Sequence, residues 1–188
     1  MPNPDYRNSN SEVEGLVDRA AHGDAEAFGC LYDTYAERIY RHIYYRTSSS
    51  EDARDLTHDV FIEVWKALPR YKRTKTPFLG WLFTICRHTI IDYYRTKKDH
   101  AYLDDNIVLQ DPGKGPEELA ETHFTQKEIR RAILKLPDQQ QQVLLLCFIE
   151  GFSYREAAAT LNKSEGNIRV IVHRALKKMW NILGAAGR

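Results

Sequence analysis

The stretch DQQQQVLLLCFIEGFSYREAAATLNKSEGNIRVIVHRALKKMW, residues 138–180, decides the fold of this chain. Its apolar run at 143–149 predicts a helix, with Asp138 in position to cap it and Gly151 to end it. Ser153 and Glu156 are spaced as a capping box, in which each residue binds the other's backbone amide. The stretch therefore predicts two helices in close succession.

The second half of this stretch predicts a turn and a longer amphipathic helix. Asn162 and Lys163 form the turn, and Ser164 can cap the helix that follows. Four apolar residues are spaced to face inward along that helix: Ile168, Val172, Ala175 and Met179. A short helix, a tight turn and an amphipathic helix predict a helix-turn-helix, although three helices that merely pack together give a similar pattern.

The outward side of the last helix carries residue types that bind a DNA duplex. Arg and Lys neutralise phosphates, Arg and Asn reach base edges, and an exposed Val can touch a thymine methyl. Most protein contacts to DNA go to phosphate or sugar, so the sequence does not say which of these residues read bases. The predicted DNA-binding residues of this motif are Ser153, Arg155, Lys163, Ser164, Asn167, Arg169, Val170, His173, Arg174 and Lys177.

Nearly every other segment also has a helical pattern, because Gly and Pro fall only between periodic stretches. The expected helices cover residues 11–23, 24–47, 48 to about 68, 77 to about 98, and 116–137, with Ser11, Asp24 and Ser48 as caps and Pro77 and Pro116 in first turns. Residues 99–116 have little periodicity. The sequence predicts an all-α chain with a helical domain at 12–98, an acidic linker at 99–116 and a helix-turn-helix domain at 117–183.

The charge of the chain alternates in blocks, although its net charge is only +1. Residues 70–98 and 127–188 are strongly basic, and residues 99–126 between them are acidic. Two separate basic blocks predict two surfaces that bind a polyanion such as DNA. For either block alone, a solvated surface is an equally fair interpretation.

The helix expected from residue 48 has an apolar face and an acidic face. Leu56, Val60, Phe61, Val64 and Leu68 are spaced toward a core. Four acids, Asp52, Asp55, Asp59 and Glu63, fall on one exposed face, where their mutual repulsion costs a few tenths of a kcal/mol per pair. A cationic protein partner would offset that cost, although a plain solvated face explains the row about as well. A single row of acids beside His58 offers no converging ligands for a metal.

The basic block at 70–98 interleaves cations with aromatic rings, a composition typical of proteins that bind unpaired nucleic acid strands. A base that leaves its stack needs a ring or pocket to receive it. The candidate residues are Arg70, Tyr71, Lys72, Arg73, Lys75, Phe78, Trp81, Arg87 and Arg95, with Tyr93 and Tyr94 beside them. Trp81 and Tyr93 can equally belong to the core, whereas Tyr71 lies in a polar loop and is the better stacking candidate.

Composition excludes several classes of protein. The polar N-terminus is no secretory signal, and no stretch approaches the roughly 18 apolar residues that span a bilayer, so we expect a soluble, cytoplasmic protein. The three cysteines form no Cys-x-x-Cys pair and are expected to be buried, reduced thiols. No converging nucleophile, acid–base pair or ligand set appears, which argues against an enzyme, a metal site or a cofactor.

Three motifs in a fixed order resemble the extracytoplasmic-function (ECF) sigma factors of bacteria. EDARDLTHDVFIEVWKAL, residues 51–68, resembles the polymerase-binding helix of that family, and PFLGWLFTICRHTIIDYYR, residues 77–95, resembles its promoter-melting helix. Residues 136–176, with EGFSYREAA at 150–158, resemble its C-terminal helix-turn-helix. The match covers about residues 15–183, and three ordered motifs are far more specific than one.

This resemblance implies a role and a partner for each motif. The acidic helix would dock on core RNA polymerase through Asp52, Asp55, Leu56, His58, Asp59, Phe61 and Glu63. The loop at 70–75 and the helix after it would bind the minus-ten element as duplex and as melted non-template strand. The helix-turn-helix would read the minus-thirty-five element. An anti-sigma factor would be a further partner, and polymerase would do the chemistry.

The chain also departs from the family pattern. His58 stands where Gln is usual, which makes that contact a candidate for pH sensitivity. Val170 and Ile171 replace the usual Ser and Arg of the recognition helix, so the family's upstream base contacts do not carry over directly. The main alternative is a free-standing helix-turn-helix regulator that binds DNA without polymerase, which would leave residues 24–98 without a role.

Overall fold

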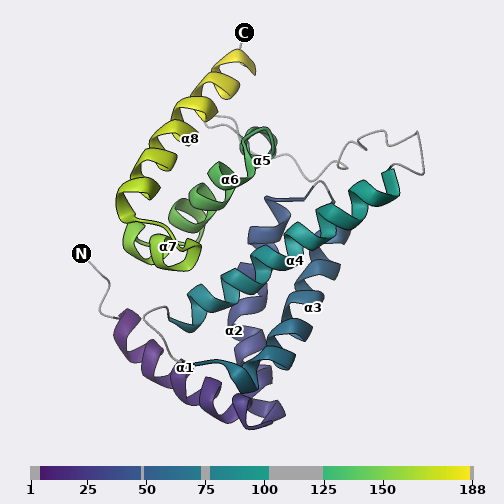
Figure 1. The fold of residues 1–188 in the computed structure, drawn as a ribbon, viewed down its shortest axis with the longest axis vertical. Coiled ribbons are helices and arrows are strands. Elements are labelled where there is room, and N and C mark those ends of the chain that lie inside the picture. Colours follow the sequence, from purple (N-terminus) through teal and green to yellow (C-terminus); the bar gives the residue numbers. More distant parts are fainter. Residues whose placement is uncertain (1–4, 48, 73–76, 102–124, 187–188) are drawn as a thin grey trace.

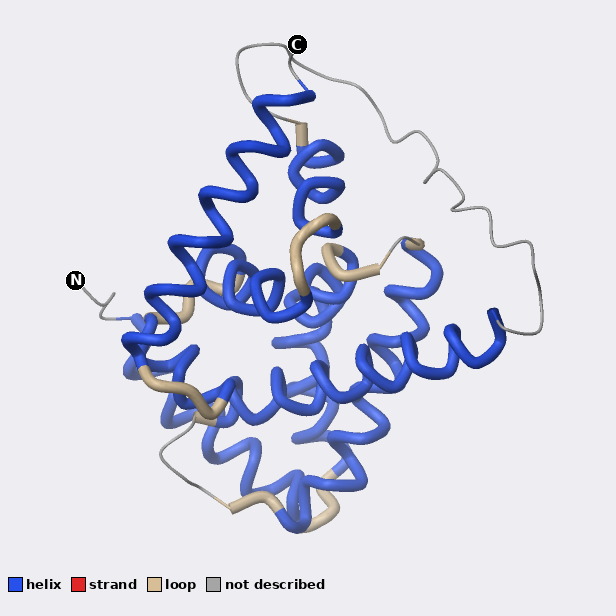
Figure 2. Tube along the Cα trace, turned by 45° about the horizontal axis from the view of Figure 1, so that its top comes forward, coloured by secondary structure: helices blue, strands red, loops and turns tan. Residues whose placement is uncertain are grey.

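The computed structural model of this chain describes residues 5–47, 49–72, 77–101 and 125–186, and it contains helices and no strands in those ranges (Figures 1 and 2). The first group of helices is α1 (Asp5–Ala21), α2 (Ala25–Tyr44), α3 (Ser50–Ala67), the 3-10 turn η1 (Leu68–Arg70) and α4 (Phe78–Ala101). The second group is α5 (Gln126–Leu134), α6 (Asp138–Leu144), the π-helical turn η2 (Leu145–Ile149), α7 (Tyr154–Leu161) and α8 (Glu165–Ala186). The predicted all-α class is confirmed.

The first helix begins at Asp5, so the prediction that Ser11 caps it is wrong. Helices α2 and α3 begin at side chains that accept hydrogen bonds from free backbone amides. Asp24 caps α2 by accepting a bond from the Ala27 amide at 3.0 Å, as expected. Ser49, not Ser48, caps α3, accepting from the amides of Glu51 and Asp52. The expectation placed the cap one residue early because three serines in a row give no local means of choosing between them.

Apolar faces of α1 to α4 pack into one core. Leu31, Ile39 and Ile43 of α2 are fully buried, and Val60 and Val64 of α3 join them. Leu82, Cys86 and Ile90 supply the face of α4. Each set follows the helical spacing expected from the sequence, because residues three and four apart share a face.

The C-terminal group starts with a capping box that the sequence reading missed. The side chain of Thr125 accepts a hydrogen bond from the Glu128 amide, and Glu128 accepts one from the Thr125 amide. The helix that carries Ile129 therefore begins at Gln126, whereas the expected start at Pro116 lies outside the described residues. The next helix begins at Asp138, but Pro137 is its capping residue and the Asp138 side chain caps nothing.

The helix-turn-helix is formed by α7 and α8 as predicted. Ser153 and Glu156 make both bonds of the capping box that starts α7. Asn162 closes that helix in the left-handed region with a φ of 51°, a conformation that Asn tolerates better than most residues. Ser164 accepts a bond from the Asn167 amide at the start of α8. Ile168, Val172 and Ala175 are buried against the other helices of the domain.

The two groups of helices pack against each other in this structure. The first helix of the motif, α7, lies against α4 (Figure 1), and one buried core runs from α1 to α8. The Phe83 ring of α4 meets the Phe152 ring edge to face, with centroids 5.4 Å apart. The sequence alone leaves this packing open, because residues 99–116 are compatible with any separation of the domains.

The cysteines behave differently from one another. Cys86 is buried, and burial raises the pKa of its thiol to about 12, while Cys147 is half-buried with a pKa of about 11 for the same reason. Cys30 is exposed on α2, so the expectation of three buried thiols is wrong for this one. The helices that the structure describes are too short or too polar to traverse a lipid bilayer.

Candidate nucleic-acid interface

The predicted acidic row lies on the outward face of α3. Asp55, Asp59 and Glu63 are exposed, and Glu63 is partnered within the helix by Lys66 at 2.7 Å. His58 is exposed within the same row, and its ring lies parallel to that of Tyr32 at 6.4 Å. The row is held in place by the buried residues on the opposite side of α3. Its carboxylates can therefore meet a cationic partner without any change in the core.

Asp52, the first acid of the row, is engaged inside the molecule instead. The hydroxyl of Tyr93 donates to Asp52 Oδ2 at 2.5 Å, and Lys97 Nζ lies 3.4 Å from the same oxygen. Partial burial raises the pKa of Tyr93, and its bond to Asp52 raises it further. Asp52 thus ties α3 to α4, and the free acidic row starts one turn later at Asp55.

Two apolar residues of the predicted polymerase contact are inside the core. Leu56 and Phe61 are 5% and 4% exposed, so they support α3 from within and do not offer a surface. The exposed apolar residues of this helix are Ile62 and Trp65, which the sequence reading did not single out. The sequence pattern does indicate their exposure, because neither residue is at the helical spacing that places Val60 and Val64 in the core.

An aromatic cluster forms where η1 leads toward α4. The Tyr71 ring lies 4.7 Å from Trp81 and 5.8 Å from Phe78, and Phe78 lies 5.6 Å from Trp81. Tyr71 and Trp81 are half-buried, whereas Phe78 is buried. The three predicted stacking residues are thus brought together with two partly open rings. Arg73 and Lys75 lie outside the described residues.

The remaining described cations of this basic block lie on η1, just after it and along α4. Arg70 and Lys72 are exposed beside the aromatic cluster. Arg95 is exposed and paired with Asp92 at 3.1 Å, while Arg87 is half-buried. Tyr94 donates its hydroxyl to the Arg46 carbonyl and Tyr93 donates to Asp52, while the two rings contact each other edge to face at 5.1 Å.

The recognition helix α8 presents a continuous basic face. Its exposed residues include Asn167, Arg169, Val170, His173, Arg174 and Lys177. Ser153, Arg155 and Ser164 are exposed at the ends of the two helices, and Lys163 is half-buried in the turn. Arg169 pairs with Glu165 one turn before it at 2.7 Å. The geometry is that of a helix whose inner side is fixed and whose outer side can enter a major groove.

No group of three His, Cys, Asp or Glu side chains converges to hold a metal within the ranges that the structure covers. The chemistry that these surfaces offer is charge, hydrogen bonding and stacking. Such surfaces bind other macromolecules.

Comparison with known proteins identifies the class of macromolecule that carries these surfaces. The sigma-70 region 2 model matches residues 31–100, and the sigma-70 region 4 model matches residues 126–179. The chain is 30% identical over 158 residues to the ECF RNA polymerase sigma factor SigX of Bacillus subtilis, covering 81% of both chains. The chain belongs to the ECF sigma factor family. It is a sigma factor and not a free-standing regulator.

Other relatives match most of this sigma factor's length, and two solved structures share its fold. The ECF sigma factor BldN of Streptomyces coelicolor is 29% identical over 182 residues, which cover 96% of this chain and 69% of BldN. The structure of CnrH in complex with the cytosolic domain of CnrY has a TM-score of 0.67 at 25% identity, over 90% of this chain and 96% of CnrH. The sigma factor RpoE of Bartonella quintana, in complex with the anti-sigma factor NepR, shares the fold with a TM-score of 0.71 at 21% identity, over 84% of this chain and 96% of RpoE.

Proposed function

We propose that this sigma factor joins core RNA polymerase through the exposed acidic row of α3. The observation that carries the proposal is the opposite charge of two exposed helix faces on one chain, acidic on α3 and basic on α8. Asp55, Asp59 and Glu63 would pair with cations of the polymerase, and Ile62 and Trp65 would add apolar contact beside them. An acidic face with exposed apolar neighbours suits a protein partner and repels DNA.

The basic face of α8 would read the minus-thirty-five element as a duplex. Arg174 and Lys177 lie on its outward side to meet phosphates, and Asn167 and Arg169 lie nearer its N-terminal end. In helix-turn-helix proteins the N-terminal residues of the recognition helix contact base edges. Val170 replaces a polar residue of the family pattern and offers apolar contact to a thymine methyl.

The aromatic cluster and the cations around it would bind the minus-ten element. Tyr71 and Trp81 offer partly open ring faces, and Arg70 and Lys72 lie beside them to meet the backbone. Stacking of a base on an aromatic ring stabilises it by roughly 1–3 kcal/mol, which offsets the stacking energy lost when the base leaves the duplex. The melted non-template strand is the ligand that uses both features.

These assignments divide the chain into two working modules. Residues 12–98 would hold polymerase and the minus-ten element, residues 99–116 would connect, and residues 117–183 would hold the minus-thirty-five element. The protein would act in the cytoplasm without chemistry of its own, since polymerase forms the phosphodiester bonds. Family membership also supports an anti-sigma factor as a regulatory partner.

Run-off transcription with purified core polymerase on genomic fragments tests this function and identifies the promoter together. We expect discrete transcripts only when the chain and core polymerase are both present. Equal transcription by core polymerase alone would contradict the proposal. A gel shift that shows tight, sequence-specific binding by the chain without polymerase would contradict the dependence on polymerase.

A further inference from the structure

A buried carboxylate joins the two domains. The side chain of Glu150, which follows η2, is 0% exposed, and its Oε2 accepts bonds from Arg38 Nε at 3.1 Å and Arg41 Nη2 at 3.3 Å. Arg38 also donates through Nη2 to the Glu150 carbonyl at 2.7 Å. Both arginines belong to α2, so one acid of the C-terminal domain occupies two cations of the N-terminal domain.

A second acid of the C-terminal domain pairs with an arginine just beyond the end of α2. Asp138, the first residue of α6, pairs with Arg46, whose side chain is only 2% exposed. In the reverse direction, Arg130 of α5 donates to the carbonyls of Tyr44 at 2.8 Å and Thr47 at 2.5 Å. Its guanidinium also lies over the Tyr44 ring at 3.9 Å. Charged contacts thus join the domains at two places, one on α2 and one at its C-terminal end, beside the apolar core that the domains share.

The two acids satisfy only part of what these arginines can donate. Nε of Arg41 and both Nε and Nη1 of Arg46 are buried, and none of the described residues accepts a bond from them. Nε of Arg87 on α4 is in the same state, and its charge lowers the pKa of Arg46, which burial lowers most. Four guanidinium groups with two carboxylates between them leave a positive surface that can take more anionic oxygens.

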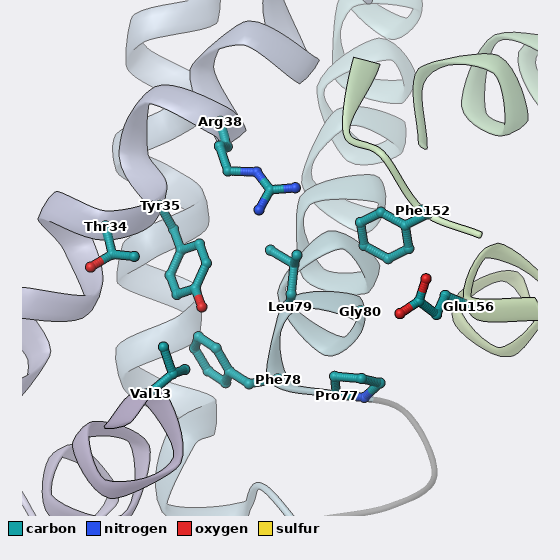
Figure 3. A pocket seen from close by; sticks show the side chains of 10 residues that line it. All are labelled: Val13, Thr34, Tyr35, Arg38, Pro77, Phe78, Leu79, Gly80, Phe152 and Glu156. Carbon is teal, nitrogen blue, oxygen red and sulfur yellow. The ribbon is translucent and has the colours of Figure 1, made fainter. Parts of the chain in front are cut away.

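The contact between the domains is open at one end. A crevice of about 270 Å³ runs between α2, the start of α4 and the segment that leads into α7. Figure 3 shows Tyr35 and Phe78 on one side of it and Phe152 and Glu156 on the other. Where buried ion pairs carry a contact, desolvation cancels much of the attraction between the charges. Apolar contact, such as that of Phe83 with Phe152, adds to these ion pairs, so the domains of the wild-type chain separate only where a ligand of the exposed surfaces offsets the loss of both.

We propose that Arg38, Arg41, Arg46 and Arg87 form a binding surface for the phosphates of duplex DNA, which Glu150 and Asp138 occupy in the free chain. This inference rests on the proposed function, because it adds phosphate contacts to those through which the N-terminal domain would bind promoter DNA. Arg87 lies one turn beyond Phe83, which Phe152 covers, and α7 packs against α4, so the C-terminal domain covers that face of α4 in the closed arrangement. Arg87 is itself one of the cations of residues 70–98 that the sequence predicts to bind DNA.

The arrangement makes DNA and the C-terminal acids competitors. Phosphates, like carboxylates, accept two parallel hydrogen bonds from an arginine guanidinium. A DNA duplex presents many phosphates in a row. Separation of the domains would therefore be favoured by DNA and opposed by the two acids. A free chain would stay closed and bind DNA weakly until the acids are displaced.

The first test measures closure in the full chain without DNA or polymerase. Glu150→Gln removes the buried charge and should open the chain, because it leaves two arginines without a counter-ion. Small-angle X-ray scattering should then give a radius of gyration larger by roughly 2 Å or more than the wild-type value. Asp138→Asn, at an exposed side chain, should shift it in the same direction by less. Glu37→Gln, on the exposed side of α2, is the matched control and should leave it unchanged.

The second test measures DNA binding with a fluorescent duplex of arbitrary sequence over a range of salt. Glu150→Gln should bind about ten-fold tighter than wild type, with a steeper salt dependence. Adding Arg38→Gln to Glu150→Gln should keep the chain open but reduce the salt slope by about 1. Circular dichroism establishes that each variant keeps wild-type helicity, and the Asp138→Asn series repeats the test if Glu150→Gln does not fold.

Two results would overturn the inference. One is an unchanged radius of gyration in Glu150→Gln and Asp138→Asn. The other is equal DNA affinity and salt slope in Glu150→Gln with and without Arg38→Gln, which would assign the opened surface to another ligand, such as acids of polymerase. Neither measurement uses polymerase, so failure of run-off transcription would contradict the proposed function separately.

Discussion

Helices α3 and α8 are built alike and differ in the sign of their outer faces. Each buries one side, α3 through Val60 and Val64 and α8 through Ile168 and Val172. Each exposes a row of like charges on the other side, with one histidine in each row, His58 and His173. The acids on α3 exclude a polyanion, whereas the cations on α8 attract one.

The difference shows that burial and partner choice are carried by separate residues of one helix. The buried side sets where the helix lies, because apolar area removed from water contributes about 25 cal/mol per Å² whatever the outer charge. The exposed row contributes little to folding, since like charges at helical spacing cost only a few tenths of a kcal/mol per pair. Changes to the two sides should therefore have different consequences.

The largest effect is expected from reversing the sign of the acidic row. Asp55→Lys with Asp59→Lys should abolish co-purification with core polymerase while far-UV circular dichroism stays that of the wild type, because both side chains are exposed. Asp33→Lys with Glu37→Lys is the matched control, with the same spacing on the exposed side of α2. Unchanged co-purification of the α3 variant would remove α3 from the polymerase interface.

Changing the buried side of α8 should affect folding before function. Ile168→Ala leaves a cavity at a residue with 0% exposure and should lower the free energy of unfolding by about 2–5 kcal/mol. Urea denaturation monitored by circular dichroism measures it. Val170→Ala, two residues away on the exposed side, should change stability by less than about 0.5 kcal/mol. Equal losses for the two variants would contradict the division of α8 into two sides.

Low pH should destabilise the fold, because His42 is buried in its neutral form. Burial, together with the charges of Arg46 and Arg41, lowers the pKa of His42 to about 3, so the unfolded chain takes up a proton first as the pH falls. Stability is then lost below about pH 6.5 and continues to fall toward pH 3. Between pH 7.5 and 5.5 this one group should cost about 1.4 kcal/mol.

Urea titrations of the wild type and His42→Gln at the two pH values check this prediction. The variant should lose that part of the pH dependence, whatever its stability at neutral pH. An identical pH dependence in both proteins would show that another group is responsible. Variants of the exposed rows of α3 and α8 should be compared at pH 7.5 or above, where His42 is neutral in the folded and the unfolded chain.

The smallest effect is expected from removing one cation of the basic row. Arg174→Ala should leave unfolding unchanged and weaken promoter use, with the salt slope of DNA binding reduced by about 1. Run-off transcription at raised salt shows the loss most clearly, because fewer phosphate contacts remain. Normal transcription there would place Arg174 outside the DNA contact. Trp180, also exposed on α8, serves as the control, and Trp180→Ala should leave the salt slope as it is.

Local signals in the sequence predicted most helices and the capping box at Ser153, because a cap depends on residues only three apart. The same kind of signal failed at Ser48 and Asp138, where a neighbouring residue competes for the same role. The apolar spacing found the core faces of α3 and α8. That spacing also placed Leu56 in the core, whereas the family resemblance assigned Leu56 to the polymerase contact and did not single out the exposed Trp65.

The sequence by itself determined an all-helical chain, a helix-turn-helix, and rows of charge whose sign is fixed by composition. Only the tertiary structure decided what Glu150 and Asp52 do, because their partners Arg38 and Tyr93 lie 112 and 41 positions away along the chain. No local pattern encodes such a pairing. It arises when packed apolar faces bring distant charges together and exclude the water that would otherwise solvate them.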